Sequence, residues 1–116
     1  MGIFKSLFGF GKKLDRDESV LAELKKVGSD LSKTHGIEFF LYLPSEDAAR
    51  QAAEKLTVDG FDVEIAPAAE GTDWVCVATK TMIPNLADIQ RISRELGTLA
   101  VSLGGVYDGW GSPVVD

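Results

Sequence analysis

Few side chains in this 116-residue sequence have the chemistry of a catalytic site. It contains one cysteine, Cys76, and one histidine, His35. A nucleophilic enzyme needs an activated side chain with a base within hydrogen-bond reach. Cys76 falls in the middle of an apolar strand pattern, where a free cysteine is usually buried packing, and His35 falls at the end of a helical pattern, as a surface or junction residue. The sequence therefore predicts no nucleophilic centre and favours a protein that is not an enzyme.

Two carboxylates have the spacing of an acid–base pair. Asp62 and Glu64 are two residues apart in an alternating pattern, so their side chains lie on one face of a strand, about 7 Å apart. Carboxyl groups at such separations catalyse acid–base reactions in some hydrolases. Charged residues on a solvated edge strand explain the pattern more simply. The other acids are scattered and no Cys or His cluster exists, so we predict no metal site and no cofactor.

Glycines are concentrated near the end of the chain. Four of them, with two large aromatic residues between them, lie within residues 104–111: Gly104, Gly105, Gly109 and Gly111. A phosphate-binding loop has its glycines between a strand and the following helix, whereas these follow a helix and continue into a strand. Glycine has the largest entropic cost of folding and gives a strand no side chain to pack. This high density of glycines predicts a bulge, a tight bend or a close backbone approach in the last strand.

Composition and charge restrict the class of protein. With 45% hydrophobic and 26% charged residues, the chain is expected to form one globular domain. Eighteen acidic against twelve basic residues give a net charge of -6, which repels a polyanion, so direct nucleic-acid binding is not expected. The single cysteine excludes an internal disulfide. No apolar run approaches the roughly 20 residues of a membrane-spanning helix, and we expect a cytoplasmic protein.

The apolar periodicity predicts an α+β fold. A helix is expected over residues 15–34, followed by a strand at 37–43, a helix from Ser45 to Asp59-Gly60, strands at 61–66 and 74–79, a helix from Pro84-Asn85 to Gly104-Gly105, and a last strand. This order is typical of the ferredoxin-like (βαββαβ) motif, a four-stranded antiparallel sheet with two helices on one face. We therefore predict three parts: a tail at 1–13, an extra N-terminal helix at 15–34, and a ferredoxin-like domain at 36–116.

Two aromatic residues are out of phase with the predicted core. Phe40 and Tyr42 alternate with the apolar set of their strand, so they point away from the helices and form a candidate exposed sheet face. RNA recognition motifs have this fold and stack bases on aromatic residues of the sheet. The strand at 74–79 lacks the basic, glycine and aromatic residues expected of such a motif. The sequence therefore argues against RNA binding here.

The N-terminal tail at 1–13 differs in composition from the rest. Its apolar residues, among them Ile3, Phe4, Leu7 and Phe8, alternate with lysines and glycines. On a helical wheel the apolar and basic side chains fall in opposite halves, as in helices that lie on a membrane surface. The glycines weaken such a helix. The alternatives stay open: a peripheral membrane contact, a flexible tail, or a tail that packs on its own domain or on a second copy of the chain in a homodimer.

The glycine-rich strand carries a family resemblance. The run Tyr107-Asp108-Gly109-Trp110-Gly111, called the signature below, resembles the hallmark of the ribonuclease E activity regulator B (RraB) family. The segments Gly60-Phe61-Asp62-Val63 and Trp74-Val75-Cys76 are also similar, and the resemblance covers about residues 36–115. It implies a bacterial, cytosolic inhibitor without catalytic activity, which binds ribonuclease E or a related endoribonuclease and modulates RNA degradation.

Two questions stay open at this stage. The signature residues either anchor a partner protein, as rigid aromatic residues do at interfaces, or hold the last strand in shape. The best-known family members continue into an acidic extension, whereas this sequence ends at Asp116, so inhibition depends on whether that extension is needed. The alternative function is a stand-alone protein-interaction module, dimeric or membrane-associated, with no connection to a ribonuclease.

Overall fold

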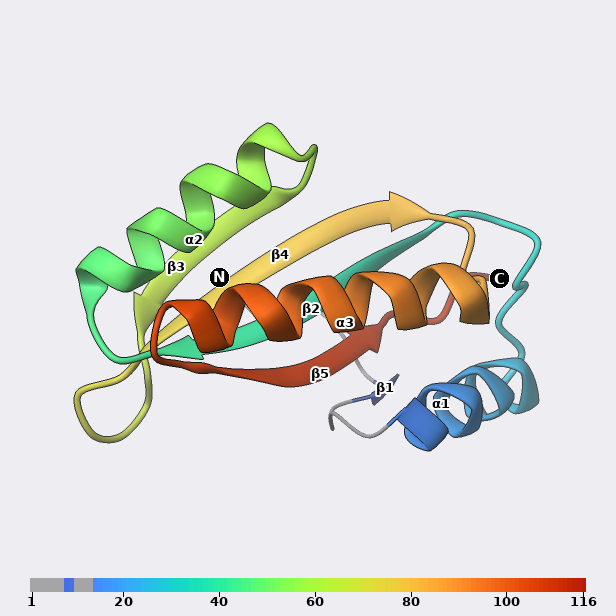
Figure 1. Ribbon diagram of the computed structural model, residues 1–116. Helices are drawn as coiled ribbons and strands as arrows, with labels where there is room; N and C mark the ends of the chain where they lie inside the picture. The colour runs from blue at the N-terminus through green and yellow to red at the C-terminus, as the bar shows by residue number, and fades with distance from the viewer. Residues whose placement is uncertain (1–7, 10–13) are drawn as a thin grey trace.

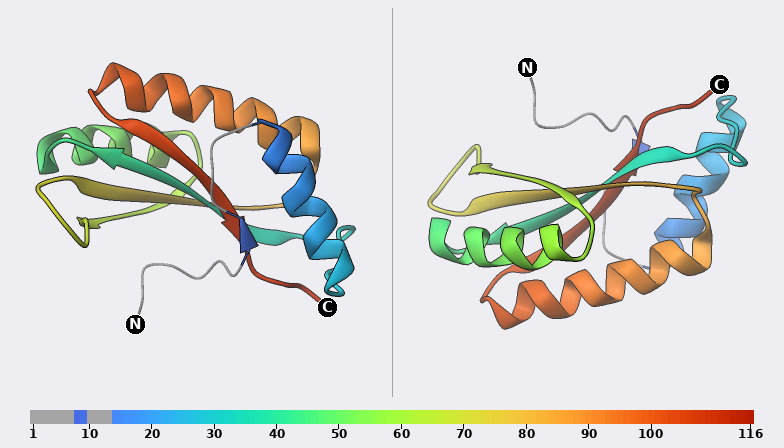
Figure 2. Two further views of the ribbon diagram at one scale, coloured as in Figure 1. Left: turned by 90° about the horizontal axis from the view of Figure 1, so that it is seen from below. Right: turned by 90° about the horizontal axis from the view of Figure 1, so that it is seen from above.

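The computed structural model describes residues 8–9 and 14–116 and has three helices and a twisted sheet (Figure 1). The elements, in chain order, are β1 (Phe8–Gly9), α1 (Leu14–Lys26), β2 (His35–Leu43), α2 (Glu46–Val58), β3 (Asp62–Pro67), β4 (Trp74–Met82), α3 (Leu86–Ser102) and β5 (Val106–Ser112). Helices α2 and α3 cover one face of the sheet, and α1 lies beside one end of α3 (Figure 2). The predicted α+β class is confirmed.

The sheet is antiparallel throughout, with the strand order β1-β5-β2-β4-β3. The order of the four longer strands, β5-β2-β4-β3, is consistent with a ferredoxin-like arrangement. The expected number of four strands is too low, because Phe8 and Gly9 pair with Ser112 and Gly111 at the outer edge of β5. Two residues are too few to show the alternation by which a strand is recognised in a sequence.

Helix α1 is shorter than the sequence predicts. It ends at Lys26, not near residue 34. Gly28 has a φ of 99°, in the left-handed region, and the amide of Ser29 donates to the carbonyl of Leu24 over 2.9 Å. This is a Schellman motif, which terminates a helix. The apolar pattern was misleading because Val27 and Leu31 continue its spacing beyond the helix end.

The other two helices begin where the sequence predicts. The Ser45 hydroxyl accepts a hydrogen bond from the amide of Ala48 at the start of α2, and the Asn85 side chain accepts one from the amide of Asp88 at the start of α3. Both residues have extended backbones, as N-cap residues do. These caps fix the starting points of the two helices that cover the sheet.

The core lies between the sheet and the helices. Alternate residues of β2 are completely buried there, with alanines of α2 and larger side chains of α3 against them: Ile37, Phe39, Leu41, Leu43, Ala49, Ala52, Ile89, Ile92 and Leu96. The rings of Phe39 and Phe61 meet edge to face, with centroids 6.0 Å apart. The predicted two-residue alternation of β2 is therefore confirmed.

The sheet face that points away from the helices is less exposed than the sequence predicts. Phe40 is only 2% exposed and packs with Val75 and Val77 in a second apolar cluster, with Tyr42 partly buried beside it. The expectation that Phe40 forms an exposed surface is therefore wrong, whereas Tyr42 keeps part of its side chain accessible. Alternation predicts the face to which a residue points, but not whether that face is covered.

Candidate functional site: a structural signature and a groove between two helices

The signature strand contains a bulge. Phe39 of β2 is opposite Trp110 and Leu41 is opposite Tyr107, so two residues of β5, Asp108 and Gly109, face the single residue between them on β2. Gly109 has a φ of 95°, a conformation that is costly for residues with a side chain. Of the bulge, tight bend or close backbone approach predicted from the glycine density, a bulge therefore occurs here.

The bulge turns both aromatic residues of the signature toward the helices. In a regular strand, Tyr107 and Trp110 would point to opposite faces, because they are three residues apart. With the extra residue between them, both are buried in the main core, with 7% and 1% of their surface exposed. Asp108 is partly exposed. Both rings are too buried to reach a partner protein directly. A role of the signature in partner binding therefore stays a prediction, and it would be indirect, because the rings fix the shape of the strand.

Each of these rings ties a different helix to the sheet. The indole nitrogen of Trp110 donates a 2.7 Å hydrogen bond to Oδ1 of Asp17, a residue of α1 that is 3% exposed. The hydroxyl of Tyr107 shares a 2.9 Å hydrogen bond with Oγ of Ser93 in α3. Burial raises the pKa of Tyr107 well above its usual value, and the bond to Ser93 only partly opposes this shift. The phenol therefore stays protonated, and the signature works as a structural connection.

We expect the bond between Tyr107 and Ser93 to stabilise the fold measurably. Tyr107→Phe leaves the buried Ser93 hydroxyl without this partner, which costs about 1–3 kcal/mol of unfolding free energy. In a double-mutant cycle with Ser93→Ala, measured by urea denaturation, we expect a coupling energy of about 1 kcal/mol. Tyr42→Phe, on the other face, is the control and should change stability by about 0.5 kcal/mol or less. Strictly additive effects of the two mutations would contradict the assignment.

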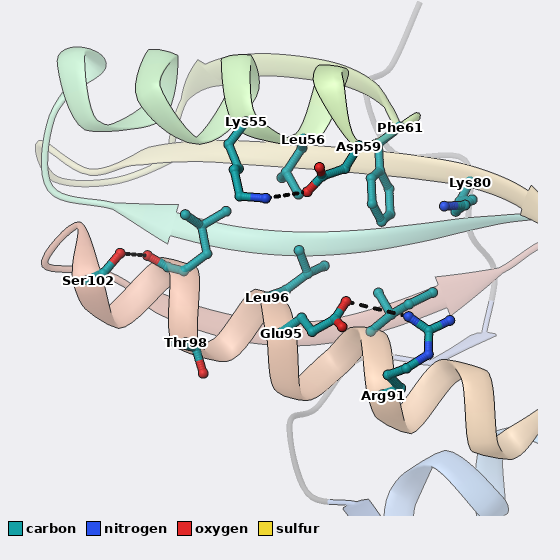
Figure 3. Close-up of a pocket in the computed structure, with 12 residues that line it drawn as sticks. Lys55, Leu56, Asp59, Phe61, Lys80, Arg91, Glu95, Leu96, Thr98 and Ser102 are labelled. Carbon is teal, nitrogen blue, oxygen red and sulfur yellow. Dashed lines mark hydrogen bonds and ion pairs between the residues drawn. The ribbon is translucent and has the colours of Figure 1, made fainter.

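One accessible site on the helix side is a groove between α2 and α3, called the α2–α3 groove below (Figure 3). Its volume is about 780 Å³. The apolar residues that line it are Leu56, Phe61, Ile92, Leu96 and Leu99, and the polar ones are Lys55, Asp59, Lys80, Arg91, Glu95, Thr98 and Ser102. The groove forms because the two helices contact the sheet rather than each other along this stretch (Figures 1 and 3).

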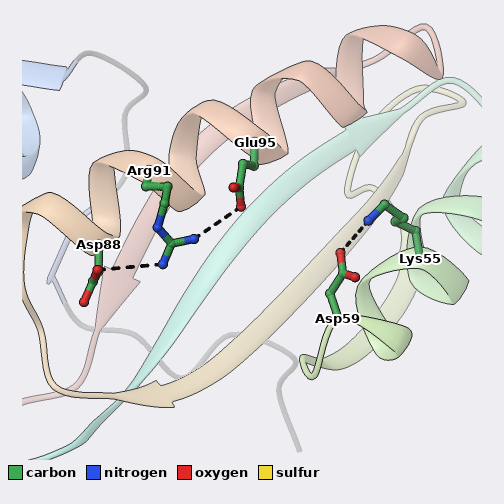
Figure 4. A network of polar contacts seen from close by, with 5 residues as sticks. All are labelled: Lys55, Asp59, Asp88, Arg91 and Glu95. Atoms are coloured by element: carbon green, nitrogen blue, oxygen red, sulfur yellow. Dashed lines mark hydrogen bonds and ion pairs between the residues drawn. The ribbon is translucent and has the colours of Figure 1, made fainter.

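Ion pairs connect most of the charged residues around the groove (Figure 4). Lys55 and Asp59, one turn apart on α2, are joined at 2.6 Å. Arg91 lies between Asp88 and Glu95 of α3, at the longer distances of 3.7 and 3.5 Å. These side chains are all 41–64% exposed, and such surface pairs contribute only about 0–1 kcal/mol each. The rim of the groove can therefore be rearranged at little cost.

Lys80 is held differently from the other cations of the groove. Its ammonium lies 4.7 Å from the centroid of the Phe61 ring, a cation–π contact. Among the described residues it takes part in no salt bridge. It extends from β4, between the two helices, so the groove has an available positive charge beside an aromatic ring.

The residues first considered for catalysis are either buried in the fold or exposed on an edge strand. Burial raises the pKa of the Cys76 thiol to about 11, which makes a thiolate scarce near neutral pH. His35 is 1% exposed, and its ring nitrogens contact the Lys33 carbonyl and the Ser29 hydroxyl, so it is a buried junction residue and not a surface one. Asp62 and Glu64 are exposed on the edge strand β3, as the simpler interpretation predicts.

Metal and membrane sites were also considered. Within the described part of the chain, no group of three or more His, Cys, Asp or Glu residues is placed to hold a metal ion. The candidate membrane residues Ile3, Phe4 and Leu7 lie outside the described residues, and Phe8 belongs to β1. Of the helices that the structure describes, none combines the length and the apolar character needed to cross a bilayer.

Sequence reasoning missed the α2–α3 groove. The periodicity of α3 indicates that Ile92, Leu96 and Leu99 face inward, but not that a groove lined by them stays open between α3 and α2. A signal was present in the small side chains of α2, Ala48, Ala49, Ala52 and Ala53, which let that helix approach the sheet closely. Its position over β3 and β4 leaves the space beside α3 unfilled.

A comparison with known proteins identifies a protein family that the chain matches. The family model described as regulator of ribonuclease activity B (RraB) matches residues 14–112. The match begins at the first residue of α1 and ends at the last residue of β5, so it includes the signature and both walls of the groove. The family is one of regulators rather than catalysts. No curated protein matches the chain with significance.

Proposed function

Since the chain belongs to the RraB family, which regulates ribonuclease activity, we propose that it binds ribonuclease E or a related endoribonuclease and lowers the rate of RNA cleavage. The proposed setting is the cytoplasm of a bacterial cell. The family match over residues 14–112 carries this proposal. The net charge of -6 supports contact with the enzyme rather than with the RNA, because an acidic chain is repelled by a polyanion.

The proposed mode of action is stoichiometric binding. The described residues present an accessible groove, and the most reactive side-chain types, Cys76 and His35, are buried. A protein of this kind inhibits an enzyme by occupying a surface that the enzyme needs. Inhibition should therefore follow the fraction of enzyme bound and should saturate near one equivalent.

A cleavage assay tests this function directly. Purified ribonuclease E and a labelled RNA substrate are incubated with increasing amounts of the full chain, and the cleavage rate should fall to a plateau. A gel-shift experiment with the chain and the RNA alone is the control, and it should show no complex. An unchanged cleavage rate, together with no co-purification of the two proteins, would exclude the proposed function.

A further inference from the structure

We infer that the α2–α3 groove is the docking site for a short, acidic, amphipathic segment of the ribonuclease. This inference rests on the proposed function and adds to it the surface used and the chemistry of the partner. The groove lies within the family-matched residues and is open to solvent, whereas the rings of the signature are buried. Three properties of the groove support the assignment: its size, its apolar floor and its cations.

The size of the groove selects a segment rather than a folded domain. Its α3 wall runs from Arg91 to Ser102, a length of about 16 Å at 1.5 Å per residue. That length matches about three turns of helix or about five extended residues. A volume of about 780 Å³ lies within the range of small-ligand pockets. The groove can therefore take the side chains along one face of a short segment.

The floor of the groove requires apolar side chains on that segment. Leu56 of α2 and Leu96 of α3 face each other from opposite walls, with Phe61 to one side of them (Figure 3). These three side chains are 2–8% exposed, and Leu99 of α3 is partly exposed, so the floor is apolar and shallow. Amphipathic segments bind such grooves by placing apolar side chains, spaced along one face, against the floor. The other face of the segment then stays in water, which explains why the groove is open on one side.

The cations of the groove specify acidic residues beside the apolar ones. Lys55, Lys80 and Arg91 come from three different elements and meet at one groove, on a chain whose net charge is -6. Lys80 takes part in no salt bridge among the described residues, and the pairs of Arg91 are long and exposed. A carboxylate of the partner can therefore bind Lys80 and replace the pairs of Arg91. Asp59 and Glu95 also line the groove, so three cations and two acids leave it a net charge of +1. Salt screens charges farther than about 8 Å away, so the acidic surface elsewhere has little effect on this local excess.

Charge reversals on α3 provide a matched test. Arg91→Glu changes a residue that lines the groove, and Arg94→Glu makes the same change in charge one turn away, at an exposed residue that is not part of the lining. Lys80→Glu reverses the charge that the sheet strand β4 contributes to the groove. We expect Arg91→Glu and Lys80→Glu each to weaken the binding of purified ribonuclease E by about tenfold, the range of a lost interfacial charge pair. Arg94→Glu should change it by less than about twofold.

The controls separate this inference from the proposed function. Each full-length variant is first melted to show that it folds, and if Arg91→Glu does not, Lys80→Glu decides the question. If the unmodified chain binds and all three variants bind equally well, the groove assignment is wrong and the proposed function stands. An equal loss in Arg94→Glu shows a general charge effect and also overturns the groove assignment. If the unmodified chain does not bind, the proposed function fails, and the docking site fails with it.

Discussion

Replacing Trp110 with alanine will bring the domain close to unfolding. Trp110 is 1% exposed, and truncation of such a buried ring costs about 3–5 kcal/mol. The buried carboxylate of Asp17 also loses the indole donor, which adds about 1–3 kcal/mol. Small domains have unfolding free energies of about 5–15 kcal/mol. Urea denaturation of the variant should show a transition at much lower denaturant concentration, or no folded baseline.

Trp110→Phe separates the two parts of this effect. The phenyl ring keeps most of the buried volume but cannot donate to Asp17, so the expected loss is about 1–3 kcal/mol. If Trp110→Ala and Trp110→Phe are equally destabilising, packing contributes little and the hydrogen bond dominates. If neither variant loses stability, the connection between α1 and β5 described above is wrong.

Gly105→Ala should be the second most damaging substitution. A Cβ atom at this position would overlap the carbonyl oxygen of Tyr42 and lie 3.1 Å from Cα of Leu43. Both contacts are with backbone atoms, so the start of β5 would have to move away from β2. We expect a loss of about 3 kcal/mol or more, at the upper end of the effects of overpacking, measured by urea denaturation.

A second glycine provides the matched control. At Gly97, in the middle of α3, an added Cβ would meet no atom within 4 Å, and alanine is the better helix former by about 0.5–1 kcal/mol. Gly97→Ala should therefore stabilise the domain by about that amount. Opposite signs for the same chemical change would show that the close approach at Gly105, and not alanine itself, causes the loss. Wild-type stability in Gly105→Ala would contradict the close approach of β5 to β2 at this position.

Local patterns predicted the features of this fold that local chemistry controls. The alternation of β2, the caps at Ser45 and Asn85 and the ends of α2 and α3 at Gly60 and Gly104 follow from neighbouring residues, whereas the end of α1 at Gly28 was missed. The glycine-rich stretch led to an expectation of a bulge or a close backbone approach, and both occur, at Gly109 and Gly105. The family resemblance of the signature is also confirmed.

Contacts between distant residues could not be predicted in this way. The bond between Asp17 and Trp110 joins residues that are 93 positions apart, and no periodicity indicates which helix packs beside which strand. The burial of Phe40 and the separation of α2 from α3 are likewise properties of tertiary packing. The candidate site was missed for this reason, although most of its apolar residues were correctly placed on the inner faces of their elements.

The two edges of the sheet differ in a way that affects self-association. At one edge, β1 pairs with part of β5 and so occupies hydrogen-bonding groups that another chain could otherwise use. The other edge is β3, which pairs only with β4 among the described strands. Exposed edges are starting points for aggregation, and charged residues on them discourage it. Asp62 and Glu64, first considered as a catalytic pair, are exposed on this edge, where two negative charges discourage pairing with the edge strand of another copy.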